Sequence, residues 1–240
     1  MKVVIAILSF VMSFSAVAQR KLKIKVEQGR NENFWRNHVL VLEKEVQLRD
    51  VATAAQSFYL RFWMDGTVLD VWQEKKSLQG SLTNWVREQV PTGEEETGRY
   101  FVVRETLDSA LCQKLYLSYQ NRQLEALPSE ERIVDWQQGF DGIIYLLETV
   151  NNDTYWLKSY WTPTAQGGLK EAAQVQGFVG DVVQVLDLRK RQSYFNTSIP
   201  FVSWTTGDGT IVSRVTTRTE YYRMKTERDR YRRLEKQQKL

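Results

Sequence analysis

The stretch Ser57–Trp72, SFYLRFWMDGTVLDVW, is the clearest local structural signal in this 240-residue chain. Two runs of alternating apolar residues flank Asp65-Gly66. An Asp-Gly pair between such runs is typical of a two-residue hairpin turn, because both central residues of that turn need a positive φ. The sequence therefore predicts a β-hairpin over residues 57–72.

A two-residue loop also sets which residues of the two strands face one another. On one side of the hairpin, which we expect to face the core, the predicted pairs are Phe62 with Leu69 and Leu60 with Val71. On the other side they are Tyr59 with Trp72, Arg61 with Asp70, and Trp63 with Val68. Each such pair contributes roughly 0.2–1 kcal/mol to sheet stability.

The second side of this hairpin is the predicted binding surface. A sheet that is covered by helices on one face leaves its other face free, and aromatic rings there can stack on sugars or on another protein's side chains. We therefore predict binding by Tyr59, Arg61, Trp63 and Trp72. The alternative is that these rings fill a core.

The remaining elements alternate between strand and helix patterns. Strands are predicted over residues 21–27, 39–46, 78–87, 99–106, 143–150 and 154–161, helices after Asp108 and over 172–186, and a third hairpin over 200–216. A short helix or turn is expected over 50–56. We predict an α+β fold in which antiparallel β-hairpins form one or two sheets with helices packed on one face, plus a charged C-terminal helix.

This interpretation divides the chain into five segments. They are a cleaved signal peptide (1–18), N-terminal strands (19–56), an α+β core of two strands-then-helix units (57–188), a possible third hairpin (189–217) and a basic helical tail (218–240).

Residues 1–18 have the pattern of a secretory signal peptide. Lys2 precedes an apolar run that is shorter than the roughly 20 residues of a membrane-spanning helix, and the run ends in AVA at residues 16–18. Gln19 follows where a lipoprotein would have a cysteine. We expect export to the periplasm or exterior without a lipid anchor and no transmembrane segment in the mature chain, with an uncleaved anchor as the alternative.

The chain has a single cysteine, Cys112, and a single histidine, His38. One cysteine excludes an intramolecular disulfide, and the common zinc sites need several His or Cys ligands. No nucleophile elbow, phosphate loop or dinucleotide-binding motif occurs. We therefore predict no metal ion, no cofactor and no catalytic residue, and we interpret His38 as a structural residue of a strand.

Carboxylates near the hairpins provide an enzymatic alternative. They are Asp65, Asp70, Asp135, Asp141 and Glu148. Two converging carboxyl groups would suit a secreted hydrolase acting on carbohydrate. Structural roles compete with this reading, since Asp65 belongs to a turn and Glu148 would share a sheet face with Lys158 if the second hairpin had a three-residue loop.

The tail is strongly basic, with nine Lys or Arg against four Asp or Glu over residues 218–240. Its predicted contact residues are Arg228, Arg230, Arg232 and Arg233. Such a helix suits an acidic surface or a partner subunit, while a solvated terminal helix is the alternative. Export disfavours nucleic acid as the partner.

These observations favour a non-enzymatic binding or assembly module of the cell envelope or exterior, whose partner is an envelope or extracellular protein or glycan. The aromatic sheet face is the expected site. A carboxylate-based hydrolase and a structural subunit that docks a partner through the C-terminal helix are the alternatives.

Overall fold

The computed structural model describes residues 23–26, 32–91, 94, 96–151 and 153–238, so the predicted signal peptide lies outside the described residues. Its helices are α1 (Glu32–Glu45), α2 (Ser109–Asn121), α3 (Lys170–Val185), α4 (Leu188–Ser198) and α5 (Arg218–Gln238). Its strands are β1 (Lys23–Val26), β2 (Phe58–Met64), β3 (Thr67–Glu74), β4 (Ser77–Glu88), β5 (Tyr100–Leu107), β6 (Ile144–Asn151), β7 (Thr154–Trp161), β8 (Ser203–Thr205) and β9 (Ile211–Ser213). Single 3-10 turns lie at Val51–Thr53, Glu130–Arg132 and Pro163–Ala165.

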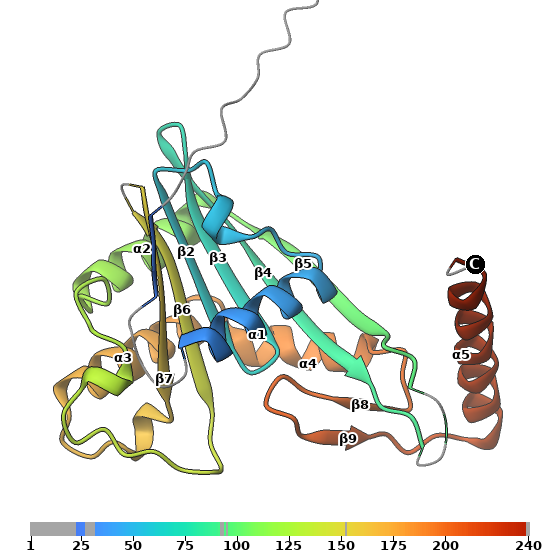
Figure 1. Cartoon of the computed structure of the whole chain (residues 1–240). Helices are drawn as coiled ribbons and strands as arrows, with labels where there is room; N and C mark the ends of the chain where they lie inside the picture. Colours follow the sequence, from blue (N-terminus) through green and yellow to red (C-terminus); the bar gives the residue numbers. More distant parts are fainter. Residues whose placement is uncertain (1–22, 27–31, 92–93, 95, 152, 239–240) are drawn as a thin grey trace, which may run out of the picture.

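The strands of the described residues form one sheet in the order β1-β7-β6-β2-β3-β4-β8-β9, with β5 also paired to β4 (Figure 1). All pairs are antiparallel except β1 with β7. The predicted α+β class with antiparallel hairpins and a charged C-terminal helix is confirmed. The two strands-then-helix units appear as β2–β5 followed by α2, and as β6–β7 followed by α3.

The first hairpin has the predicted register. Asp65 and Gly66 both adopt positive φ, at 21° and 68°. Tyr59 pairs with Trp72 and Phe62 with Leu69, as expected for a two-residue loop. Local turn chemistry alone was enough to set this pairing.

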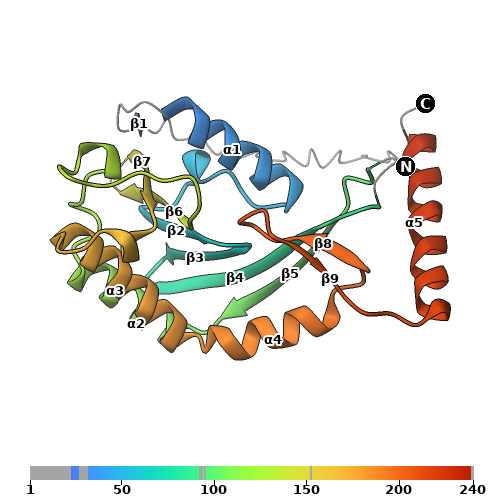
Figure 2. The same ribbon diagram turned by 90° about the horizontal axis from the view of Figure 1, so that it is seen from below.

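One face of the sheet packs against α2 and α3 and forms the larger core (Figure 2). Alternate residues of the central strands point into it, together with the apolar stripes of the two helices. Its fully buried members include Leu60, Phe62, Leu69, Leu82, Leu115, Phe178 and Val182. Asp108 caps α2 as its position predicts, accepting a hydrogen bond from the Leu111 backbone N–H at 2.8 Å.

Helix α1 lies across the other face (Figure 2), and here the sequence-based assignment is wrong. Residues 39–46 were predicted as a strand within a segment of N-terminal strands, but residues 39–45 belong to helix α1, as does His38, and Val46 lies in the turn that follows. Within the described part of residues 19–56 only β1 is a strand. The expected short helix or turn at 50–56 is confirmed as the 3-10 turn capped by Asp50.

The cause of this error is a run of apolar residues that is compatible both with a β-strand and with the spacing of an α-helix. His38 to Leu42 reads HVLVL, which is typical of a strand because of its β-branched content. The helical spacing lies in a wider window, in Trp35, Val39, Leu42 and Val46, and these four residues pack onto the sheet. Val41 on the opposite side of the helix is exposed.

The second hairpin has a shorter loop than the one considered above. Asn151 pairs with Thr154, so the loop has two residues and Glu148 lies opposite Leu157. Glu148 and Lys158 therefore lie on opposite faces of the sheet, because the three-residue loop on which their pairing depended is not the one present. Lys158 instead donates hydrogen bonds to two backbone carbonyls in the segment that follows helix α2, those of Leu124 (3.1 Å) and Glu125 (2.7 Å).

The third predicted hairpin is present as β8 and β9 and follows α4. Its turn packs directly on the turn of the first hairpin. The Asp208 backbone N–H donates to Asp65 Oδ1 at 2.8 Å, and a Cβ on Gly207 would overlap the backbone of Gly66. Two turns that lie 143 residues apart in sequence thus meet at one end of the sheet.

Candidate functional site

The four residues of the predicted binding surface do not form an open face. Tyr59, Arg61 and Trp63 are only 1%, 0% and 6% exposed, and Trp72 is partly buried. The expectation that they face solvent is wrong because α1 and the segment that follows it cover this side of β2 and β3. The cross-strand contacts themselves are present, with the rings of Tyr59 and Trp72 stacked at 5.9 Å.

Arg61 is the centre of a buried polar network. Its Nε donates to Asp70 Oδ1 at 2.6 Å, and its Nη1 donates to Glu43 Oε1 of α1 at 2.6 Å. Nη1 also donates to the Arg49 carbonyl at 2.9 Å and lies 3.9 Å from Glu148 Oε2. The network thereby ties α1 and the loop after it to the sheet.

Glu148 forms the second half of this network. It accepts hydrogen bonds from the Trp63 indole N–H at 2.6 Å and from the Tyr155 hydroxyl at 2.8 Å. Arg36 of α1 donates to Tyr155 at 3.1 Å and to Asp50 at 3.1 Å. Through Arg36 these bonds connect α1 to β7 and to the loop that follows the helix.

Burial shifts the protonation of the two central glutamates. It raises the pKa of Glu43 to about 8, and the nearby Glu148 adds to that rise. Burial also raises the pKa of Glu148, against the opposing effect of Arg61. Burial alone would lower the pKa of Arg61, but Asp70 and Glu148 hold it above its usual value. Arg61 is therefore charged and Glu43 is neutral at pH 7.

This glutamate pair is not accessible to a substrate. Glu43 and Glu148 both approach Arg61 Nη1, at 2.6 and 3.9 Å. They are only 3% and 0% exposed, because they lie between α1 and the sheet. Asp70 lies in the same interior. Asp135 and Asp141 are exposed, in the loop between α2 and β6.

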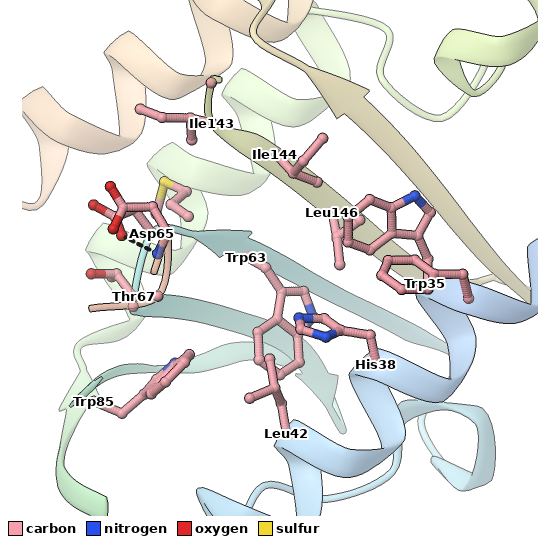
Figure 3. A pocket seen from close by; sticks show the side chains of 16 residues that line it. Trp35, His38, Leu42, Trp63, Asp65, Thr67, Trp85, Ile143, Ile144 and Leu146 are labelled. Atoms are coloured by element: carbon pink, nitrogen blue, oxygen red, sulfur yellow. Dashed lines mark hydrogen bonds between the residues drawn. The ribbon is translucent and has the colours of Figure 1, made fainter. Parts of the chain in front are cut away.

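A cleft of about 260 Å³ opens beside this network, between α1 and the end of the sheet that carries the β2–β3 turn (Figure 3). Its lining is mainly aromatic and aliphatic. Figure 3 shows side chains of α1 reaching towards β2, which carries Trp63. The ring and aliphatic side chains of the lining are Phe34, Trp35, His38, Leu42, Trp63, Trp85, Ile143, Ile144 and Leu146.

Several separate segments hold these rings in place. Trp35, His38 and Leu42 come from one side of α1, Trp63 from β2, and Trp85 from β4. The rings of Phe34 and Trp35 meet edge to face at 4.8 Å. Burial lowers the pKa of His38, so its imidazole is neutral at pH 7.

Two indole nitrogens of the lining have unused hydrogen-bonding capacity. The Nε1 atoms of Trp35 and Trp85 are buried and have no acceptor among the described residues, whereas Trp63 donates to Glu148. A buried donor without an acceptor costs about 1–3 kcal/mol.

Two aspartates, Asp65 and Asp208, form one wall of the cleft. Each begins an Asp-Gly-Thr sequence at a hairpin turn. Burial and the neighbouring Asp208 raise the pKa of Asp65. Partial burial would raise the pKa of Asp208 as well, but hydrogen bonds from Thr206 and Thr210 hold it below its usual range.

The arginines of the tail divide into two groups. Arg228 and Arg232 of α5 donate to Glu94, at 2.8 and 3.3 Å, and Arg228 is buried. These two arginines therefore form intramolecular ion pairs. Arg230 and Arg233, the other two predicted contact residues, are exposed.

Among the described residues no cluster of three or more His, Cys, Asp or Glu is arranged to hold a metal ion. In the same part of the chain, no helix is both long and apolar enough to cross a membrane. The lone Cys112 is buried, and burial raises the pKa of its thiol to about 11.

Sequence reasoning missed most of the cleft. Trp35 was hidden because α1 was assigned as a strand, and Trp85 and Asp208 were not singled out. Two signals were present in the sequence: the spacing of Trp35, Val39 and Leu42, and the repetition of Asp-Gly-Thr at two turns. Neither signal says that the two turns meet.

The chain matches no known protein family, and no curated protein is detectably similar to it in sequence.

Proposed function

We propose that the protein is an exported, non-enzymatic binding module of the cell envelope or exterior, and that its ligand site is the aromatic cleft under α1. The ligand is a small molecule, or a single ring presented by an envelope glycan or protein. This proposal keeps the class of function that the sequence favours and moves the site from the open sheet face to the cleft.

The observation that carries the proposal is the convergence of Trp35, Trp63 and Trp85 from three elements on one cavity. Ligand sites are typically concave, largely apolar and supplied with a few polar groups that orient the ligand. The cleft has this composition, with the two carboxylates of Asp65 and Asp208 at the edge of an apolar interior. Its volume of about 260 Å³ suits one ring rather than a long chain.

Substitution of the cleft tests the proposal. Benzyl alcohol, cyclohexanol and methyl β-glucoside are titrated into the protein, and binding is followed by NMR chemical shifts and tryptophan fluorescence. We expect at least one of these neutral rings to bind and Trp35→Ala to weaken that binding by about tenfold or more, equivalent to about 1.4 kcal/mol.

Phe140→Ala is the matched control, because Phe140 is a large exposed ring that does not line the cleft. It should leave binding unchanged. Failure of these three probes and of benzyltrimethylammonium to bind the folded protein, or equal binding by the Trp35 and Phe140 variants, contradicts the proposal.

A carboxylate-based hydrolase acting on carbohydrate remains the alternative function. Its geometric support is weaker, since Glu43 and Glu148 are sealed under α1 and Asp65 interacts with Asp208. A glycosidase pair needs an accessible separation of roughly 5–9.5 Å. Release of reducing sugar from envelope glycans that is abolished by Asp65→Asn would favour the hydrolase over the binding module.

A structural subunit that docks a partner through α5 is the third function to consider. The exposed Arg230 and Arg233 favour an acidic partner for this helix.

A further inference from the structure

We propose that the aromatic cleft selects a small organic cation, an amine or quaternary ammonium group carried on an apolar body. This inference rests on the proposed function, because it names the ligand class of the same cleft. It commits to a free small molecule as the occupant.

The charges around the cleft are of one sign. Its lining includes two carboxylates, Asp65 and Asp208, and no lysine or arginine among the described residues. His38, the remaining titratable group of the lining, lies on α1 and is neutral at pH 7. A cleft lined by one sign of charge concentrates ligands of the opposite sign.

The two arginines of the interior network beside the cleft, Arg61 and Arg36, do not line it. Arg61 is bonded to Asp70 and Glu43, and Arg36 is bonded to Asp50. Both guanidinium groups are thus paired within the interior network. The carboxylates at the two turns have no such partner in the lining.

The aromatic rings supply the second component of cation recognition. A cation above the face of an indole or phenyl ring is attracted by the negative face of the π system, and tryptophan gives the strongest interaction. Phe34, Trp35, Trp63 and Trp85 all line the cleft. The same rings and the aliphatic residues of β6 accommodate the apolar body of the ligand.

Other ligand classes fit less well. An anionic ligand would add a negative charge beside Asp65 and Asp208 without a lysine or arginine in the lining to receive it. A neutral ring would gain the apolar contacts alone. A cation gains both the apolar contacts and the pairing with the carboxylates.

Three benzyl compounds of different charge separate these possibilities. They are benzyltrimethylammonium, its neutral carbon counterpart neopentylbenzene, and the anion phenylacetate. Dissociation constants are measured by NMR titration of the full chain at pH 7 and constant salt. We expect the cation to bind about tenfold or more tightly than the neutral probe, and the anion most weakly.

Carboxylate substitutions then locate the effect. Asp65→Asn retains the turn, since Asn-Gly is equally suited to it, and still accepts the Asp208 N–H. The double variant Asp65→Asn, Asp208→Asn should weaken binding of the cation by about tenfold or more and leave that of the neutral probe within about twofold. Asp153→Asn is the control, because Asp153 also has a positive φ in a two-residue turn but lies at the opposite end of β6.

The outcomes distinguish the two proposals. If the neutral probe binds and the cation binds no more tightly, or if the double variant keeps full affinity for the cation, the choice of a cation is wrong while the binding cleft stands. If neither probe binds a protein whose circular dichroism and unfolding midpoint are unchanged, both proposals fail. Loss of cation binding in Asp153→Asn would also overturn the assignment of the effect to the cleft.

Discussion

Arg61 lies fully buried in the hairpin that the sequence predicts most clearly. Its pairing with Asp70 follows from the turn, but its second partner, Glu43, comes from a helix 18 residues earlier. A buried guanidinium needs its partners, because removing it leaves the Asp70 carboxylate unpaired in a dry interior, and removing a partner leaves the guanidinium without its hydrogen bond. Arg61 and its partner Glu43 each lead to a prediction.

Arg61→Met should lower the free energy of unfolding by about 3–5 kcal/mol, because Asp70 and Glu148 lose their compensating charge while an unbranched apolar stem is kept. Arg87→Met is the control, since Arg87 pairs with Glu96 at the exposed end of β4 and should lose less than about 1 kcal/mol. Urea unfolding of the two variants gives both values. A loss below about 1 kcal/mol for Arg61→Met would show that the network does not stabilise the fold.

Glu43 makes stability depend on pH. Its pKa is about 8 in the folded protein, against an ordinary value of 4.5. The folded state therefore keeps a proton that the unfolded chain releases, so this stabilisation is complete below about pH 4.5 and is lost as the pH rises through about 8. The loss is at most about 1.4 kcal/mol per pH unit.

Glu43→Gln isolates this effect, because glutamine still accepts the hydrogen bonds from Arg61 and from the Val51 backbone. Urea unfolding between pH 5 and 9 should show the wild-type protein losing stability relative to the variant as pH rises. Glu74→Gln, at an exposed position of β3, should run parallel to the wild type. Parallel curves for Glu43→Gln as well would contradict the raised pKa.

At the scale of elements, the contact between the two Asp-Gly-Thr turns determines the shape of the cleft. The β8–β9 turn brings Asp208 to Asp65, and the close approach depends on Gly207, where a Cβ would overlap the backbone of Gly66. Helix α1 provides the opposite wall. The cleft therefore exists only where a helix and two distant hairpins meet.

Gly207→Ala should push the two turns apart and destabilise the protein by about 1–3 kcal/mol, because backbone atoms on both sides must move. It should also weaken binding of any cleft ligand. Gly167→Ala is the control, since a Cβ there meets no atom within 4 Å, and its effect should stay within about 1 kcal/mol. Differential scanning calorimetry checks both variants, and equal unfolding midpoints would rule out a tight contact between the turns.

At the scale of the whole molecule, α5 stands apart from the sheet and its helices (Figure 2). Its described contacts with the rest of the chain include the ion pairs of Arg228 and Arg232 with Glu94, and Arg99 lies 5.2 Å from the centre of the Tyr231 ring. These contacts lie on one side of the helix and leave Arg230 and Arg233 exposed. The remainder of the fold is complete without it.

Deletion of residues 218–240 should therefore change the free energy of unfolding by less than about 2 kcal/mol, as expected for a few partly exposed ion pairs. If α5 docks a partner subunit, the deletion should also reduce the oligomeric mass measured by light scattering. Glu94→Gln serves as the control, since it removes the ion pairs and retains the exposed arginines. Global unfolding of the truncated chain would mean that α5 belongs to the core.

The hairpin register, the caps and the amphipathic helices α2 and α3 were predictable because each depends on neighbours in the sequence. Asp65-Gly66 sets a turn, Asp108 caps a helix, and the spacing of Ala172 and Val175 marks a buried stripe. The basic tail was predictable as a helix for the same reason. The location of β8 and β9 on the sheet was not, because their pairing joins residues far apart in the sequence.

The candidate site shows the same division. Trp63 and Asp65 were singled out from the hairpin, and they do line the cleft. Their surroundings were wrong, since solvent was expected where α1 lies. A strand pattern shows which residues share a face but not whether another element covers that face.

The local order of the amino acids thus specifies the hairpins, the main helices, the single unpaired cysteine and the charge of the tail, because these depend on backbone preference and on composition. The burial of Arg61, the raised pKa of Glu43 and the meeting of Asp65 with Asp208 arise only when α1 and the last hairpin pack onto the sheet. Burial and electrostatics act through space, and the distances on which they depend are created by packing.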